Sequence, residues 1–178
     1  MKIREATGAD FQDVWDVERR AFSTDSEAVL VKNLLADPTA QPLISLLAYE
    51  DGKAVGHILL TKAMLDTSPE LPCLILAPLA VVPEFQKRGI GTALMKEALR
   101  LAALRGVDRV FVLGHPGYYP RAGFRNDAEA LGFEAPYPIP AKHKAAWMVA
   151  ELLPGTIGKV RGKVRVADTL MKPEYWRE

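Results

Sequence analysis

The sequence predicts an α/β protein built as one mixed sheet with helices on both faces. Residues 73–82 are almost entirely apolar, which is typical of a strand covered on both sides. Residues 89–105 follow with helical periodicity, and residues 109–113 form a second apolar strand. Before them, two strand-like segments are joined by Asp51-Gly52, which is typical of a hairpin turn. A strand–helix–strand unit preceded by meandering strands favours a single mixed sheet.

The N-terminal part predicts a short strand, residues 2–4, and two helices. Thr7 stands at an N-cap position with Asp10 three residues later, which is a weakened capping box. The helix that follows carries these side chains at helical spacing: Phe11, Val14, Trp15, Glu18 and Phe22. A second helix is predicted over residues 26–35, and it ends before Pro38 because a residue that precedes proline disfavours the helical conformation.

Three strands are predicted next. Residues 43–49 and 54–65 form a hairpin around the turn, and residues 68–72, which contain two prolines, are expected to be a loop. Residues 73–82 form the third strand. Pro78 lies in its middle and has no N–H, so strand pairing must break there, as at a bulge or a splayed edge.

The second half continues with one long helix and further strands. The apolar stripe of the helix over 89–105 consists of Ile90, Leu94, Ala98 and Leu101, and Gly106 ends the helix. The remaining predicted elements are a strand over 109–113, a helical turn that ends at Gly123, an irregular stretch over 124–140, a strand over 145–152, and an edge strand or hairpin near 160–166.

Length and charge limit the class of protein. A chain of 178 residues fits one domain, which we expect to have a core at about 1–152 and a C-terminal extension over 153–178. An apolar fraction of 49% argues against disorder. Lys and Arg number 23 and Asp and Glu 22, which leaves a net charge of +1 and argues against a general nucleic-acid binder.

Cysteine, histidine and hydropathy exclude further classes. The single cysteine, Cys73, rules out an intrachain disulfide framework and a four-cysteine zinc site. The 3 histidines lack the spacing of metal ligands, so we expect no metal. The start has no secretory apolar region, and the apolar run over 74–82 is far shorter than the roughly 20 residues of a membrane helix. We expect a cytoplasmic protein without a membrane partner.

The segment over 83–92 joins the buried strand to the long helix and predicts an anion site. Gly89 and Gly91 allow a ligand to approach the backbone closely, and the free N–H groups and dipole of a helix start attract negative charge. Lys87 and Arg88 add cationic donors, so a pyrophosphate is the natural ligand. The alternative is a tight glycine turn that feeds a closely packed helix, with the basic pair merely solvated.

The common nucleotide-binding patterns do not fit this segment. The dinucleotide fingerprint requires a third glycine, where Leu94 stands, and an acidic residue at the end of a second strand. The Gly-Lys-Ser/Thr of a Walker loop does not occur. A nucleotide-dependent oxidoreductase therefore remains only the weaker alternative.

Two motifs in a fixed order carry a resemblance. Gln86-x-x-Gly89-x-Gly91 after an apolar strand is similar to the acetyl-CoA pyrophosphate loop of the Gcn5-related N-acetyltransferase (GNAT) family. Residues 118–124, Tyr-Tyr-Pro-Arg-Ala-Gly-Phe, resemble the tyrosine segment that the family places near the cofactor thiol. Residues 79–86 and 113–119 also resemble a small bacterial subgroup that is mostly uncharacterised.

The resemblance implies a fold and an activity. The fold would have a central, mostly antiparallel sheet with a splayed parallel pair and flanking helices. The activity would be transfer of an acetyl group from acetyl-CoA to a primary amine by direct attack through a tetrahedral intermediate. A non-catalytic acetyl-CoA-binding sensor or assembly module is the alternative. The acceptor, a small molecule or a peptide amine, stays open, and so does a homodimer.

The resemblance also implies site residues. A backbone N–H near Val81 would hold the oxyanion, and Ala80 and Val82 would pair with the pantetheine amides. The cofactor-binding set is Leu79, Ala80, Val81, Val82, Gln86, Lys87, Arg88, Gly89, Ile90, Gly91, Thr92 and Tyr119. Tyr119 is the candidate general acid for the departing thiolate, with a packing role as its alternative. Tyr118 is expected to pack.

The general base is the least determined role. His115 is the candidate, since a neutral imidazole suits proton removal, and its alternative is a turn histidine bonded to the backbone. His57 is expected to be a satisfied strand histidine, and Cys73 a buried core residue. Charged residues with weaker prospects are Glu84, Asp66, Glu70 and His143 with Lys142 and Lys144. The tryptophans Trp15, Trp147 and Trp176 are expected to pack, with Trp176 as a possible dimer contact.

Overall fold

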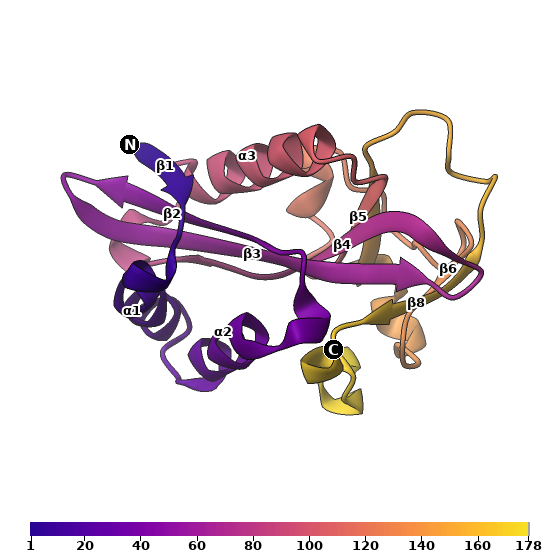
Figure 1. The fold of residues 1–178 in the computed structure, drawn as a ribbon, viewed down its shortest axis with the longest axis horizontal. Coiled ribbons are helices and arrows are strands. Elements are labelled where there is room, and N and C mark those ends of the chain that lie inside the picture. The colour runs from indigo at the N-terminus through magenta and orange to yellow at the C-terminus, as the bar shows by residue number, and fades with distance from the viewer. Residues whose placement is uncertain (178) are drawn as a thin grey trace.

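The computed structural model describes residues 1–177, and its strands follow the order β1-β2-β3-β4-β5-β7, with β8 beside β3 and β6 beside β8 (Figure 1). The strands are β1 (Lys2–Glu5), β2 (Ile44–Glu50), β3 (Lys53–Leu65), β4 (Ser68–Val81), β5 (Arg109–Leu113), β6 (Phe133–Glu134), β7 (Trp147–Glu151) and β8 (Gly162–Val166). The helices are α1 (Phe11–Phe22), α2 (Ser26–Ala36) and α3 (Ile90–Leu104). Neighbours along the main order are antiparallel except β4 and β5.

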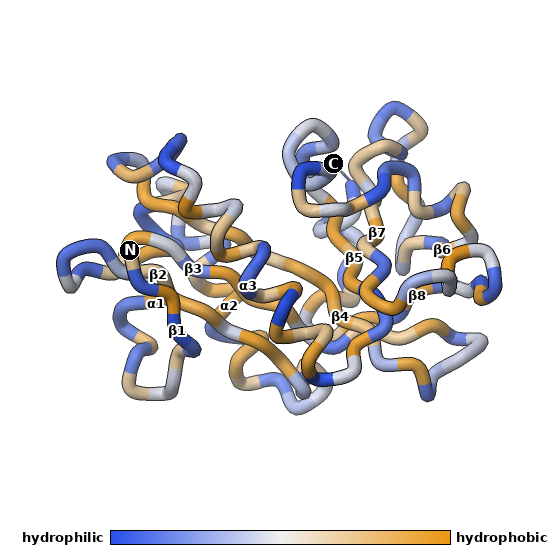
Figure 2. The backbone as a smooth tube through the Cα atoms, turned by 90° about the horizontal axis from the view of Figure 1, so that it is seen from above, coloured by the Kyte–Doolittle hydropathy of each residue, from blue (hydrophilic) through white to orange (hydrophobic). Residues whose placement is uncertain are grey.

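Two apolar layers cover the sheet, one on each face. Helix α3 lies on one face with Ile90, Leu94 and Met95 buried in the first core cluster. Helix α2 lies on the other face, and its apolar side chains join the second cluster around Phe111 and Trp147. Figure 2 shows the strands between them as predominantly apolar. The predicted mixed sheet with helices on both faces is confirmed.

The predicted loop over 68–72 is wrong in part, because β4 begins at Ser68. Ser68 pairs with Leu65 across the tight turn at residues 66 and 67, so β4 already begins at the first residue of the predicted loop. The register then shifts, and Cys73 pairs with Ala63. The stretch 69–72 therefore bulges out of the ladder, as expected where prolines without an N–H interrupt pairing.

Strands β4 and β5 separate halfway along their length. They pair in parallel only from Cys73 to Leu76, against residues 109–112. Opposite Leu59 of β3, Ala77 and Pro78 occupy the place of one residue, so the bulge predicted at Pro78 is confirmed. Beyond it β4 stays with β3 as far as Val81, while β5 ends at Leu113. The expected splayed parallel pair is present.

The C-terminal segment after residue 152 completes the second core. Strand β8 pairs with β3, and Val164 and Trp176 are buried. The Trp176 indole N–H donates to the Leu170 carbonyl at 3.0 Å, and its ring meets Trp147 edge-on with centroids 5.5 Å apart. Because Trp176 is 2% exposed, it has no free surface for the dimer contact considered from the sequence. The division into a core and an extension stays a prediction.

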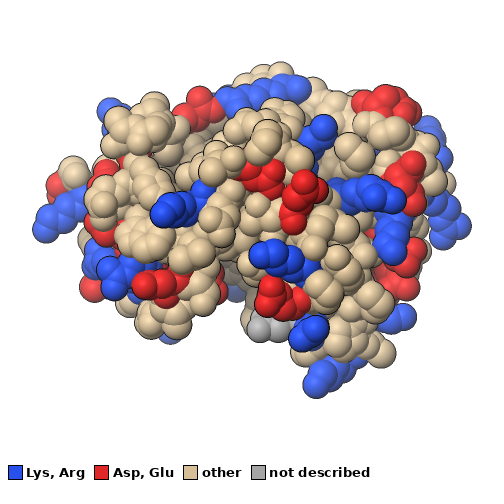
Figure 3. All heavy atoms as spheres, turned by 60° about the horizontal axis from the view of Figure 1, so that its bottom comes forward, with Lys and Arg blue, Asp and Glu red and all other residues tan. Residues whose placement is uncertain are grey.

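The surface carries charges of both signs. On the face shown in Figure 3, Lys and Arg are interspersed with Asp and Glu. This mixture is what the net charge of +1 leads one to expect. No helix within residues 1–177 combines the length and the apolar character needed to cross a membrane.

Candidate active site

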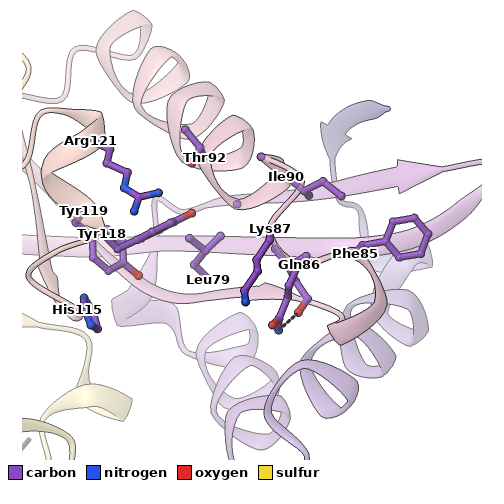
Figure 4. Close-up of a pocket in the computed structure, with 13 residues that line it drawn as sticks. Leu79, Phe85, Gln86, Lys87, Ile90, Thr92, His115, Tyr118, Tyr119 and Arg121 are labelled. Atoms are coloured by element: carbon purple, nitrogen blue, oxygen red, sulfur yellow. Dashed lines mark hydrogen bonds between the residues drawn. The ribbon is translucent and has the colours of Figure 1, made fainter.

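A cavity of about 610 Å³ lies where β4 and β5 separate (Figure 4). It is lined by ten residues that the sequence singled out, namely Leu79, Val81, Gln86, Lys87, Gly89, Ile90, Gly91, Thr92, His115 and Tyr119, and by Phe85, Tyr118 and Arg121. The two motifs of the sequence therefore meet in space, with Leu79 between the loop after β4 and the tyrosine pair. Ala80, Val82 and Arg88 do not line the cavity within the described structure.

The start of α3 presents free backbone donors to this cavity. Gly89 is the N-cap with φ +82°, a left-handed conformation that glycine adopts without strain. The first helical hydrogen bond runs from the Ala93 N–H to the Gly89 carbonyl at 3.0 Å. The N–H groups of Ile90, Gly91 and Thr92 precede it and have no carbonyl within the helix to bind. They and the helix dipole favour an anion here.

The loop before α3 is held to the end of β4. The Gln86 side-chain amide donates to the Val81 carbonyl at 3.0 Å, which fixes the loop beside the strand. Lys87 lies in the cavity lining, with φ +62°. Arg88 instead stacks its guanidinium over the Phe85 ring at 4.8 Å. Lys87 is thus the better placed of the two predicted cations.

The backbone of β4 corrects one expectation. The Val82 N–H donates to the Val55 carbonyl at 2.9 Å, so it is used within the β3–β4 ladder. In a strand the N–H and C=O groups of every second residue point to the same neighbouring strand. The N–H and C=O of Ala80 therefore also point to β3, where Ala80 lies opposite His57. The polar groups of Leu79 and Val81 face the other edge, toward the gap left by β5. The Val82 N–H is therefore not free for a ligand, and the backbone polar groups on the open edge of β4 are those of Leu79 and Val81.

Tyr119 lines the cavity. Its ring packs edge-on against Tyr118 and Phe124, with centroids 5.2 and 5.7 Å away. Burial raises the pKa of the Tyr119 hydroxyl well above its ordinary value, and the neighbouring Tyr118 adds to the rise. The hydroxyl is thus protonated at neutral pH, as in any tyrosine, and its raised pKa makes it a weaker acid than a solvated one.

His115 is less suited to the role that the sequence gave it. The Gly117 N–H donates to His115 Nδ1 at 3.1 Å, so the lone pair of that nitrogen is occupied. In a neutral imidazole the other nitrogen, Nε2, then carries the proton. No lone pair is left for an ammonium proton, so the arrangement matches the alternative of a turn histidine.

His57 belongs to a buried polar chain and not to the cavity. Its Nδ1 lies 2.6 Å from Glu18 Oε2, and its Nε2 lies 2.9 Å from Ser45 Oγ. All three side chains are buried between α1 and the sheet. This is the satisfied strand histidine that the sequence favoured, although nothing in the sequence pointed to Glu18 as its partner.

The remaining candidates lie outside the cavity. Asp66 accepts the Lys163 N–H at 2.9 Å, and Glu84 pairs with Arg20 at 2.8 Å. Glu70 and the charged run 142–144 are not among the cavity residues. Burial raises the pKa of the Cys73 thiol to about 12, so Cys73 is the inert core residue that was expected. Within residues 1–177, no cluster of three or more metal-ligating side chains occurs.

A second cavity, of about 300 Å³, adjoins the first. The two share Leu79 and Tyr119. The second extends toward α1 and α2, where Phe22, Glu27 and Leu30 line it, and is bounded also by Tyr175 and Trp176. Sequence reasoning missed this cavity because its walls come from both ends of the chain. It also missed Arg121, although a basic residue within the tyrosine motif was a usable signal.

The comparison with known families decides the assignment. The model of the "Acetyltransferase (GNAT) family" matches residues 5–124, which include both motifs. The chain belongs to this family. It is 47% identical over 161 residues to the uncharacterized N-acetyltransferase YjhQ of Escherichia coli K12, covering 90% of this chain and 88% of that protein.

Solved structures agree with this membership of the GNAT family. YhbS from Escherichia coli, solved in complex with CoA, superposes with a TM-score of 0.85 at 26% identity, covering 96% of this chain and 92% of that one. A GNAT acetyltransferase from Brucella melitensis, solved with acetyl-CoA, gives 0.74 at 25% identity, covering 94% and 96%. The expected GNAT fold is thus confirmed.

Proposed function

We propose that this GNAT protein transfers the acetyl group of acetyl-CoA to a primary amine. The observation that carries the proposal is the meeting of two features in one cavity. These are the free N–H groups at the start of α3 and the edge of β4 at Leu79 and Val81, from which β5 has separated. The first suits a pyrophosphate and the second an amide-bearing chain. The relatives solved with CoA and acetyl-CoA support the choice of ligand.

The residues of the chain fit this ligand along its length. Lys87 and the N–H groups of Ile90, Gly91 and Thr92 would bind the pyrophosphate. The backbone of Leu79 would pair with the pantetheine amides, in the place that β5 would take if the strands did not separate. Val81 then presents its N–H beside the reacting carbonyl. When bound, acetyl-CoA supplies an activated thioester carbonyl.

The chemistry requires a neutral amine and an acid. An alkyl ammonium with a pKa near ~10.4 must first lose a proton to solvent or a base. The amine nitrogen then bonds to the thioester carbon, the carbon–sulfur bond breaks, and the second proton on nitrogen is lost as the sulfur gains one. The Val81 N–H would stabilise the oxyanion, which is worth about 3 kcal/mol in comparable sites. Tyr119, which lines the cavity, would protonate the departing sulfur.

The test is turnover with a broad panel of amines. Release of the CoA thiol would be followed with acetyl-CoA and each amine, and the acetylated product identified by mass spectrometry. We expect amine-dependent release of CoA. Binding of acetyl-CoA without turnover on any amine would favour the non-catalytic sensor or assembly module instead. Binding of NAD(P)H but not of acetyl-CoA would favour the oxidoreductase.

Partners and place of action remain proposals. We propose an amine as the partner substrate, with neither nucleic acid nor membrane involved, and we keep the cytoplasm as the place of action, where acetyl-CoA is available. The homodimer considered from the sequence also stays a prediction, without Trp176 as its contact.

A further inference from the structure

The second cavity is connected to the donor cavity at the point where the chemistry would occur. Both are lined by Leu79 and Tyr119, so a ligand in the second cavity can reach the residues that flank the thioester. The two approach this point from opposite sides of the sheet, because one is walled by the start of α3 and the other by α1 and α2.

The side chains that line the second cavity are apolar apart from the Glu27 carboxylate and the hydroxyls of Tyr119 and Tyr175. Aliphatic and aromatic side chains such as Leu30, Leu76 and Trp176 make up most of the lining. Glu27 is the one charged side chain among the lining residues of the described structure. A ligand with several ammonium groups would leave all but one of them against apolar walls, which is costly because each buried charge needs a partner.

Glu27 is placed as an anchor for a cation. It lies in the first turn of α2, where the Thr24 hydroxyl donates to its Oε2 at 3.3 Å. Glu18 of α1 is buried, and its Oε1 has no hydrogen-bond partner within residues 1–177. Burial is the main cause that raises the pKa of Glu18; the contact with His57 opposes the rise, and the negative charge of Glu27 adds to it.

Two aromatic rings lie at the exposed side of the same cavity. Phe22 ends α1 and Tyr175 belongs to the C-terminal segment, and each is 37% exposed although it is a large apolar side chain. Tyr175 is positioned by its neighbour Trp176, which is buried against Trp147. Exposed aromatic rings at the rim of an apolar cavity suit the apolar part of a ligand.

We propose that the second cavity binds the acceptor as a small primary amine with one positive charge on an apolar body, the ammonium beside Glu27 and the apolar body between Phe22 and Tyr175. The inference rests on the proposed acetyl transfer and deepens it. The volume of about 300 Å³ is at the lower end for ligand sites, so it accommodates a small molecule better than a folded chain. In this proposal the C-terminal segment forms one wall of the acceptor site through Tyr175 and Trp176.

The experiment compares amines that differ in charge and in apolar surface. 2-Phenylethylamine, the diamine putrescine and a lysine-containing peptide would be acetylated under identical conditions, with acetyl-CoA saturating. We expect kcat/KM for 2-phenylethylamine to exceed that for each of the other two by at least roughly tenfold. The additional charged groups of putrescine and of the peptide would lose hydrogen bonds to water in the cavity, and one such loss is worth about that factor. A preference for putrescine or for the peptide would overturn the inference.

Two variants test the named residues. Glu27→Gln keeps the shape and removes the charge, and we expect it to raise the KM for 2-phenylethylamine by about 10- to 100-fold while the KM for acetyl-CoA stays constant. Tyr175→Ala should raise the KM for 2-phenylethylamine but not that for ethylamine, which has almost no apolar body. Glu70→Gln, at an exposed acid outside both cavities, is the matched control. An unchanged KM in Glu27→Gln would overturn the inference.

A binding measurement separates the failure of this inference from that of the proposed function. 2-Phenylethylamine would be titrated into the complex of the protein with CoA, for wild type and Glu27→Gln. Weaker binding to Glu27→Gln supports the acceptor site even without turnover, and equal binding contradicts it. If CoA itself fails to bind, the proposed function fails first.

Discussion

The hydroxyl of Tyr118 lies against the backbone of Gly91, so close that a Cβ on Gly91 would be 2.5 Å from Tyr118 Oη. This contact joins the two sequence motifs, because Gly91 belongs to the start of α3 and Tyr118 to the tyrosine segment. The glycine is therefore needed for the approach of a tyrosine of the same chain, in addition to any ligand.

Gly91→Ala tests this contact. The added methyl should displace Tyr118 and cost about 1 kcal/mol or more of unfolding free energy, as overpacking does. Combining Gly91→Ala with Tyr118→Phe removes the clash. The nearest atom left on residue 118, Cζ, would then be 3.7 Å from the added Cβ, which is an ordinary contact. Denaturant unfolding of both single variants and the double variant should give a favourable coupling of at least ~1 kcal/mol. Additive effects would show that the contact is not formed.

Tyr119→Phe should lower turnover while leaving acetyl-CoA affinity unchanged. A lost general acid costs roughly 10²-fold in kcat. Because burial raises the pKa of Tyr119, the hydroxyl keeps its proton through the ordinary range of tyrosine titration, so wild-type kcat should not fall on the alkaline side until above about pH 10. Tyr137→Phe, which loses only a hydrogen bond to the Met171 carbonyl, is the control. Equal kcat in Tyr119→Phe would remove the acid role.

His115→Ala should leave the shape of the pH–rate profile unchanged. The Nδ1 lone pair of His115 is taken by the Gly117 N–H, so the side chain supports its turn and does not accept the substrate proton. A modest fall in kcat at all pH values would reflect a loosened turn. Loss of the acidic limb of the profile in this variant would restore His115 as the base.

Glu18→Gln should stabilise the protein more as the pH rises. The pKa of Glu18 is raised in the folded state above its usual value of 4.5, chiefly by burial, so folding favours its protonated form. Below pH 4.5 the carboxyl is protonated in both states, and glutamine resembles it. Above that pH the Glu18 carboxyl ionises more readily in the unfolded chain than in the folded one, which lowers the free energy of the unfolded state. The unfolding free energy of the wild type therefore falls, whereas that of Glu18→Gln does not change through this group. Urea unfolding at pH 4 and pH 8 measures the difference. A stability difference that is independent of pH would contradict the burial of a neutral carboxyl.

Much of the fold followed from local patterns. The apolar runs, the Asp51-Gly52 turn, Gly106 and the break at Pro78 each depend on the properties of one or a few adjacent residues, and the structure bears them out. The start of β4 was missed because Ser68 pairs across a turn whose closure depends on the whole hairpin. The residues of β4 whose backbone groups face the gap also depend on the register after the bulge, which no local pattern reveals. The sequence therefore pointed to Ala80 and Val82, whereas the backbone groups of Leu79 and Val81 face the gap.

The candidate site divides in the same way. The pyrophosphate loop is contiguous in sequence and could be predicted, and its meeting with the tyrosine motif followed from the resemblance. The pairing of Glu18 with His57 spans 39 residues, and no local pattern signals it. The second cavity combines α1, α2, β4 and the C-terminal segment, so only the three-dimensional structure brings Glu27 and Tyr175 to one wall.

Titration calorimetry of acetyl-CoA tests the central claim most directly, with Gly89→Asp and Gly52→Asp beside wild type. Both glycines have a positive φ, +82° and +78°, and open space around a Cβ, so the two variants suffer similar backbone strain. Only Gly89→Asp puts a negative charge at the start of α3. We predict that wild type and Gly52→Asp bind alike and that Gly89→Asp binds at least roughly tenfold more weakly, since repulsion replaces helix-dipole attraction. Absence of binding to wild type, or equal binding by Gly89→Asp, would contradict the account.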